Sequence, residues 1–196
     1  MAVAFPMASD LESTLDLSLP AAVAVDPLRS SEVRSEVLRL FDDCAPGLRR
    51  YVMSFGLATE SADDVVQEVF LALFRHLCLG RSRTNLRGWI FQVGHNLALK
   101  HRQQARRRQG AAWSVEEAEA VADPADTPEE SIAVRQRQER LRSVMRALPD
   151  RDRRCLCLRA EGLRYRDIAR TLGISLGSVA KSIARGLARL TNADIG

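Results

Sequence analysis

The spacing of apolar and polar residues predicts a helix that begins at Ser61, its capping residue, and runs to Leu77. At about 100° per residue, large apolar side chains gather on one side of this helix. These are Val65, Val66, Val69, Phe70, Leu73, Phe74 and Leu77. The other side holds Asp64, Gln67, Glu68, Leu71 and Arg75. We expect the first set to form a core face. The second set is either a solvated face or, because Leu71 lies among polar residues, a contact surface.

A second helix is predicted to begin near Leu86, after the loop sequence LGRSRTN. Its inward positions are Trp89, Ile90, Val93 and Leu97, and a different side holds Phe91, His95, Leu99, Arg102 and Arg106. Residues 79–109 contain no Asp or Glu, and their bases are Arg81, Arg83, Arg87, Lys100, Arg102, Arg106, Arg107 and Arg108. A basic surface without acids repels itself unless a polyanion screens it. The segment therefore favours contact with nucleic acid over the alternative, a solvated helix end.

The residues near the C-terminus have the pattern of a helix-turn-helix motif. A short amphipathic helix is predicted over Tyr165–Leu172, Gly173 allows a left-handed backbone after it, and Ser175 can cap the next helix. The next helix has its predicted apolar face at Val179, Ile183, Leu187 and Leu190, and its opposite face at Ser178, Lys181, Ser182, Arg185 and Arg189. Arg and Lys suit guanine edges and phosphates, so the second face is typical of a helix that reads the major groove. A purely structural three-helix packing is the alternative.

Charge and composition divide the chain into four segments. Residues 1–30 are rich in Pro, Ser and Ala without periodicity, and we expect them to form a disordered arm. Residues 31–109 and 131–192 are predicted to form two small helical domains. Between them, residues 110–130 contain seven acids, no base and two prolines, which predicts a flexible acidic linker. Aromatic residues make up only 5% and strand-like alternation is scarce, so the predicted fold class is all-α.

Net charge, the length of apolar runs and the cysteines indicate further properties of the protein. The net charge is +4 and the pI is near 9.2, a mild preference for an anionic partner. No apolar run approaches the roughly 18–20 residues that span a bilayer, and the N-terminus lacks a basic start, so we expect a cytoplasmic protein without membrane insertion. Cys155 and Cys157 lie in an apolar helical setting and are expected to be buried thiols, with redox or metal sensing as the alternative.

No sequence motif indicates catalysis. The sequence has no Ser/His/Asp set, no cysteine and histidine spacing typical of a metal site and no phosphate-binding glycine loop. We therefore expect no enzyme activity, no cofactor and no bound metal. The three histidines, His76, His95 and His101, are expected at the surface or facing nucleic acid rather than as ligands.

Two parts of the chain, in this order, resemble one family. ESADDVVQEVFLALFRHL and NLRGWIFQVGHNLALKHRQQARRR are similar to regions 2.2, 2.3 and 2.4 of the extracytoplasmic-function class of bacterial sigma factors. LRSVMRALPDRDRRCLCLRAEGLRYRDIARTLGISLGSVAKSIARGLARL resembles region 4 of that class. The resemblance covers about residues 33–108 and 131–190. It implies a protein that guides core RNA polymerase to promoters and helps to open DNA, while the polymerase forms the bonds.

The resemblance also implies a role for each surface. The residues that would dock on the β′ clamp helices of core RNA polymerase are Asp64, Gln67, Glu68, Leu71 and Arg75. The residues that would engage the −10 element as single-stranded DNA are Arg81, Arg83, Asn85, His95, Asn96, Arg102 and Arg106. The residues that would read the −35 element as duplex are Ser178, Lys181, Ser182, Arg185 and Arg189. The β subunit flap is a further polymerase contact, the acidic linker would run toward the RNA exit path, and an anti-sigma factor is a candidate partner.

The predicted reading helix differs from the usual family pattern. In the family a Lys and then Ser-Arg usually follow Gly-Thr/Ser-Val, whereas here the order is Ala180, Lys181, Ser182, which displaces the basic face by one position. Gly186 inside this helix costs about 1 kcal/mol relative to alanine and allows close packing or bending.

Two other functions remain open: a stand-alone helix-turn-helix regulator, and a sigma-like adaptor that binds polymerase without reading DNA. A stand-alone regulator needs neither the acid-free segment 79–109 nor the DDVVQE face.

Overall fold

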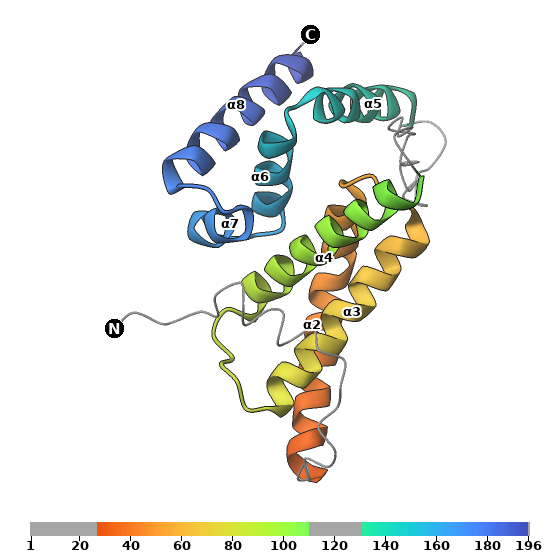
Figure 1. The fold of residues 1–196 in the computed structure, drawn as a ribbon. Coiled ribbons are helices and arrows are strands. Elements are labelled where there is room, and N and C mark those ends of the chain that lie inside the picture. The colour runs from red at the N-terminus through yellow and green to blue at the C-terminus, as the bar shows by residue number, and fades with distance from the viewer. Residues whose placement is uncertain (1–26, 110–130, 196) are drawn as a thin grey trace. The chain divides into compact units, whose positions relative to one another are not determined.

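The computed structural model describes residues 27–109 and 131–195, and every regular element in these ranges is an α-helix (Figure 1). The chain divides into two compact units, residues 1–114 and 115–196. Unit 1 contains α2 (Pro27–Met53), α3 (Thr59–Cys78) and α4 (Leu86–Gln109). Unit 2 contains α5 (Ser131–Ala147), α6 (Asp150–Ala160), α7 (Tyr165–Leu172) and α8 (Leu176–Ile195). The all-α prediction is confirmed. The linker predicted at 110–130 and most of the arm predicted at 1–30 lie outside the described residues, and α2 begins within that predicted arm.

The core of unit 1 forms where α2, α3 and α4 pack on one another. Its fully buried side chains include Leu48, Tyr51 and Val52 from α2, Val65, Val69 and Leu73 from α3, and Ile90, Phe91 and Leu97 from α4. In α3 these residues recur every four positions, the spacing that places side chains on one face of a helix. The predicted apolar face of α3 is buried, except that Phe74 is half-buried. The predicted capping residue is wrong: α3 begins at Thr59, and Ala58 occupies the N-cap without a side-chain hydrogen bond.

Helix α4 is buried on more sides than its sequence pattern predicted. The predicted inward residues Trp89, Ile90, Val93 and Leu97 are buried. Phe91 and His95, predicted for a different side, are buried as well. The reason is that α2 covers this second side. The Tyr51 ring lies 6.0 Å from the Phe91 ring between centroids, and the Tyr51 hydroxyl lies 2.7 Å from His95 Nδ1.

Helix α8 packs against each of the other three helices of unit 2, α5, α6 and α7. The preceding helix α7 has the predicted bounds, and it ends at Gly173, whose φ of 64° is left-handed. Glycine lacks the Cβ that makes this conformation unfavourable for other residues. Ser175 Oγ then accepts the backbone N–H of Ser178 at 3.2 Å. Both predicted residues of the turn, Gly173 and Ser175, are therefore confirmed.

The buried stripe of α8 differs from the prediction. It includes Val179, Ser182, Ile183 and Gly186, which are spaced as one helical face. Ser182 was predicted on the exposed face and Leu187 on the apolar face, yet Ser182 is 1% exposed and Leu187 is 52% exposed. The reason is a close approach of α6 at Gly186. A Cβ at this position would overlap Leu156 Cδ1 and lie 3.0 Å from Leu156 Cγ.

An ion pair also joins α6 to α8. The buried Asp152 carboxylate accepts hydrogen bonds from Arg185 Nη2 at 2.8 Å and from Arg185 Nε at 3.1 Å. The Arg185 guanidinium lowers the pKa of the Asp152 carboxyl below its ordinary value of 3.8, although burial acts in the opposite direction. Two hydrogen bonds from a cation satisfy a carboxylate that would otherwise be costly to bury.

The close approach at Gly186 predicts opposite effects for two glycine-to-alanine changes in α8. We expect Gly186→Ala to lower the free energy of unfolding of unit 2 by about 1–3 kcal/mol, because the new methyl group overpacks the contact with Leu156. A Cβ at Gly177 would meet open space, so Gly177→Ala should be neutral or stabilising by up to about 1 kcal/mol. Urea unfolding, with amide exchange of α6 and α8 as the local readout, measures both. Equal stability of the two variants would contradict the overpacking.

The lowered pKa of Asp152 predicts a pH-dependent loss of stability. A carboxyl with a depressed folded-state pKa stabilises the fold fully above its unfolded-state pKa, and this stabilisation is lost as pH falls through the folded-state pKa. Asp152→Asn should therefore be less stable than the parent chain at pH 7, with a difference that shrinks below pH 3.8. Urea unfolding at a series of pH values measures this difference.

The matched control is Asp150→Asn, which removes an exposed carboxylate from the same helix. It should change the unfolding free energy less, because exposed ion pairs contribute little. A stability difference between parent and Asp152→Asn that does not change down to pH 3 would contradict the assignment.

Candidate functional site

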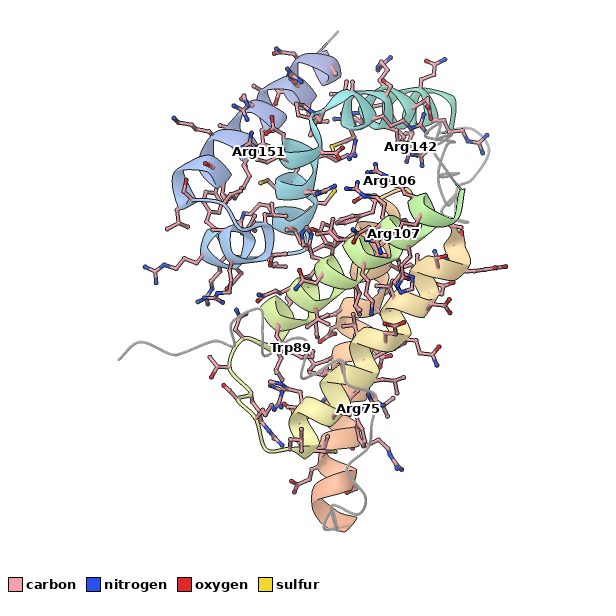
Figure 2. The ribbon with its side chains drawn as sticks, in the orientation of Figure 1. Arg75, Trp89, Arg106, Arg107, Arg142 and Arg151 are labelled. Atoms are coloured by element: carbon pink, nitrogen blue, oxygen red, sulfur yellow. The ribbon has the colours of Figure 1, made fainter. Side chains whose placement is uncertain are left out.

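One exposed side of α3 carries all five residues predicted to bind polymerase. Asp64, Gln67, Glu68 and Leu71 are exposed and Arg75 is half-buried. Leu71 is 48% exposed, a large apolar side chain among polar neighbours. Figure 2 shows Arg75 projecting from this helix. We call Asp64, Gln67, Glu68, Leu71 and Arg75 the α3 strip. The structure brings these residues together, and their role remains a prediction.

Two polar contacts of α3, one made by Glu68 of the strip and one by Asp63 beside it, connect this helix to its neighbours. Glu68 Oε1 lies 3.5 Å from His101 Nε2 on α4. Asp63, next to the strip, pairs with Arg49 of α2 at 2.5 Å, and this hydrogen bond raises the pKa of Arg49. The strip is therefore carried by a helix that is tied to α2 on one side and to α4 on the other.

The loop between α3 and α4, residues 79–85, is tied to all three helices of unit 1. His76 Nε2 on α3 lies 2.9 Å from the carbonyl oxygen of Ser82, and Arg83 Nη1 pairs with Glu36 of α2 at 3.1 Å. At the start of α4, Asn85 has a φ of 56°, and its side-chain oxygen accepts the N–H of Gly88 at 3.3 Å. Asn tolerates this left-handed conformation better than most residues. The predicted −10 residues Arg81, Arg83 and Asn85 thus lie on an anchored loop.

His76 is a correction to the sequence prediction, because it is buried rather than at the surface. Its side chain is 6% exposed, and its ring lies 4.8 Å from the Trp89 ring between centroids. The sequence held a signal for this burial. His76 follows Leu73 by three positions, which places it on the apolar side of α3.

The predicted −10 residues on α4 fall into buried and exposed groups. His95 is 5% exposed and lies in the core beside Tyr51, so its predicted contact with DNA is wrong. Asn96 and Arg102 are half-buried, and the Arg102 guanidinium lies 5.9 Å from the centre of the Phe55 ring. Arg106 is exposed beside Arg107 in the last turns of α4 (Figure 2). Among the α4 side chains that the structure describes, the exposed cations at this end are Lys100, Arg106 and Arg107, which we call the α4 basic end.

The predicted −35 residues on α8 are mostly exposed. Lys181, Arg185 and Arg189 recur every four residues on its outer face, and we call these three the α8 edge. Ser178 is half-buried in the first turn, with its Oγ 2.9 Å from Ser175 Oγ. Ser182 is 1% exposed and lies in the core near Asp152 and Cys155, which contradicts its predicted place on the DNA-facing side of α8.

The cysteines of α6 fit their predicted apolar setting. Cys155 is buried and Cys157 is half-buried, and burial raises the pKa of both thiols. Within residues 27–109 and 131–195, the side chains of His, Cys, Asp and Glu form no group of three that could hold a metal ion. In the same ranges, no helix combines the length and apolar character needed to cross a bilayer.

Comparison with known proteins adds two family matches. Residues 40–108 match the Sigma-70 region 2 model, and residues 138–190 match the model of Sigma-70, region 4. The first match covers α3, nearly all of α4 and part of α2. The second covers α6, α7, most of α8 and part of α5. The α3 strip and the α4 basic end therefore lie in region 2, and the α8 edge lies in region 4.

Curated relatives match across both units. The chain is 31% identical over 150 residues to the RNA polymerase sigma factor CnrH of Cupriavidus metallidurans, and this match covers 74% of the chain and 78% of the relative. It is 29% identical over 147 residues to the RNA polymerase sigma factor NccH of Alcaligenes xylosoxydans xylosoxydans, with the same two coverages.

Two solved structures share the fold. One is the sigma factor RpoE in complex with the anti-sigma factor NepR from Bartonella quintana, with a TM-score of 0.63 and 19% identity over 83% of this chain and 96% of that one. The other is CnrH in complex with the cytosolic domain of CnrY, with a TM-score of 0.53 and 22% identity over 86% of this chain and 96% of that one. Region 2 and region 4 matches in this order, together with relatives that include named ECF RNA polymerase sigma factors, show that the chain belongs to the extracytoplasmic-function (ECF) class of RNA polymerase sigma factors.

Proposed function

We propose that this sigma factor directs promoter recognition through three separate surfaces, one for the polymerase and one for each promoter element. The observation that carries the proposal is the position of the α8 edge. Its three cations are exposed on the second helix of a helix-turn-helix motif, in a different unit from the α3 strip. Two DNA-binding surfaces on separate units suit a protein that contacts two separated promoter elements.

In unit 1 the α3 strip would dock on the β′ clamp helices. Its exposed leucine provides apolar contact area, and the surrounding carboxylates and arginine provide charge complementarity, which favours association rate and specificity. The α4 basic end and the loop 79–85 would contact the −10 element. A loop with fixed hydrogen bonds can present pockets to unpaired bases, while nearby arginines contact the backbone.

In unit 2 the α8 edge would contact the −35 element as duplex. Arg and Lys side chains bind phosphates and the acceptor edge of guanine, and an exposed helix of this kind fits the major groove. The Ser175 cap fixes the start of α8 and with it the orientation of the side chains that follow along the helix. The corrections at Ser182 and His95 leave Ser178, Lys181, Arg185 and Arg189 as the candidates here. For the −10 element they leave Arg81, Arg83, Asn85, Asn96, Arg102 and Arg106.

The chemistry of such a factor is binding rather than bond formation. Sigma factors are generally non-enzymatic initiation factors. If unit 1 binds the unpaired −10 strand more tightly than the duplex, the difference in affinity shifts the equilibrium toward open DNA. The polymerase then forms the phosphodiester bonds. We also propose that the protein works in the cytoplasm, that unit 2 contacts the β subunit flap, and that an anti-sigma factor controls its availability, as the complexes of the two structural neighbours suggest.

The test is run-off transcription with purified core polymerase on fragmented genomic DNA. The full-length chain should give discrete new start sites that share two upstream elements at a fixed spacing. Asp64→Lys combined with Glu68→Lys should weaken core binding by roughly tenfold and reduce all start sites together, because both acids lie on the α3 strip.

The matched control combines Asp42→Lys with Asp43→Lys, which makes the same charge change on an exposed part of α2. It should leave core affinity near that of the parent chain. Equal weakening by both pairs would remove the docking role from the α3 strip. Core binding without any new start site would favour a sigma-like adaptor, and duplex binding without core binding would favour a stand-alone regulator.

The α8 edge predicts a change in salt dependence. Lys181→Ala combined with Arg189→Ala should weaken duplex binding and reduce the slope of log affinity against log salt by about 0.9 for each phosphate that is no longer neutralised. Arg34→Ala combined with Arg39→Ala removes two exposed arginines from α2 and serves as the control. Fluorescence anisotropy of a labelled promoter duplex at several salt concentrations measures both slopes. A parental slope in the Lys181/Arg189 variant would place these residues away from DNA.

A further inference from the structure

The ion pair between α6 and α8 occupies one edge of the Arg185 guanidinium. Asp152 Oδ2 accepts a hydrogen bond from Nε at 3.1 Å, and Asp152 Oδ1 accepts one from Nη2 at 2.8 Å. A guanidinium is planar and carries five N–H donors in a rigid fork. Asp152 therefore binds the side edge of this fork. The outer edge, formed by Nη1 and the second hydrogen of Nη2, is not used by this carboxylate.

The two partners differ sharply in exposure. The Asp152 side chain is 2% exposed, whereas the Arg185 side chain is 57% exposed. The carboxylate is thus fixed inside unit 2, while the guanidinium that it holds reaches the surface of α8. Ion pairing in a desolvated site restricts the arginine more than an ion pair between two mobile surface side chains would.

The surroundings of Asp152 are closely packed. Asp152 comes from α6, whose Leu156 packs directly against Gly186, one residue after Arg185. The side chains of Cys155 and Ser182 are both buried, and both lie near the Asp152 carboxylate. The carboxylate, the arginine and the close helix contact therefore form one small assembly at the middle of α8.

An arginine held in this way is suited to a guanine. The outer edge of a guanidinium can donate two parallel hydrogen bonds to O6 and N7 of guanine in the major groove. Pre-orientation reduces the conformational entropy that the side chain loses on binding. Ser182, three residues earlier in α8, is buried, so few polar side chains on this part of the helix remain for base contact.

We propose that Asp152 is a positioning residue for promoter recognition: it holds Arg185 so that the outer guanidinium edge meets a guanine of the upstream promoter element. This inference rests on the proposed function of α8 as the helix that binds the −35 duplex. It adds a residue from α6, outside the helix-turn-helix motif, to the determinants of base choice. A purely structural role of the pair would change stability but not the preferred base.

The test compares base preference among variants of the full-length chain. Each protein selects duplexes from a library with a randomised segment of about one helical turn of DNA, and the selected pools are sequenced. The base position at which Arg185→Ala loses its guanine preference is the position that Arg185 contacts. Asp152→Asn should then reduce guanine preference at that same position by about tenfold and leave the other positions unchanged.

Asp150→Asn is the matched control, because it makes the same charge change on the same helix but removes a carboxylate that pairs with Arg153 and Arg154 instead. Its base preference should equal that of the parent chain. Arg185→Lys is a second variant in case Asp152→Asn does not fold. It keeps the charge and loses the fork whose side edge Asp152 binds, so it should weaken the guanine preference at that position while keeping the parental salt slope.

The possible outcomes separate this inference from the proposed function. A parent chain that enriches no sequence would refute −35 reading by α8, and the inference with it. A parent chain that selects a sequence while Asp152→Asn keeps full guanine preference would refute the inference alone. A uniform loss of affinity in Arg185→Ala, with a reduced salt slope and unchanged base preference, would identify a phosphate contact and also refute it.

Discussion

In each unit, one helix packs against all the other helices and also carries exposed cations. α4 packs on both α2 and α3, and α8 packs on α5, α6 and α7. Such a helix must bury one side completely and leave the remaining side to solvent. The cations of the α4 basic end and the α8 edge stand on these remaining sides. The position of each charged group is therefore set by the packing of the core beneath it, and a change in the core would displace the basic surface above it.

This arrangement has a consequence for recognition. Side chains on a well-packed helix keep their spacing better than side chains on a mobile loop, and accurate spacing is needed to match the repeat of nucleic acid. Where a loop is used, between α3 and α4, three hydrogen-bonded or ionic contacts to the surrounding helices fix it through His76, Arg83 and Asn85. The loop thus gains from tertiary contacts the rigidity that a helix has from its own backbone.

Local signals explain most of what could be predicted from the sequence. The bounds of α7, the left-handed Gly173 and the Ser175 cap follow from residues within a few positions of one another. The buried face of α3 follows from its regular apolar spacing. These features depend on short-range geometry, which the order of residues determines directly.

Features that depend on distant parts of the chain were missed. His95 is buried because Tyr51 of α2 covers it, and nothing near His95 in the sequence indicates this. Ser182 and Leu187 exchanged their predicted sides because two small residues, Ser182 and Gly186, let α6 approach α8. The pair of Asp152 and Arg185 joins residues 33 positions apart. A polar or small residue on an inner face carries no apolar signal, so only the packed structure reveals its position.

The two thiols of α6 have a chemical consequence of their own. Burial raises the pKa of Cys155 and Cys157, so the thiolate fraction of each is small at neutral pH. The thiolate is the form that reacts with peroxides, disulfides and alkylating agents. The two thiols of α6 are therefore less reactive toward oxidants and alkylating agents than ordinary exposed cysteines.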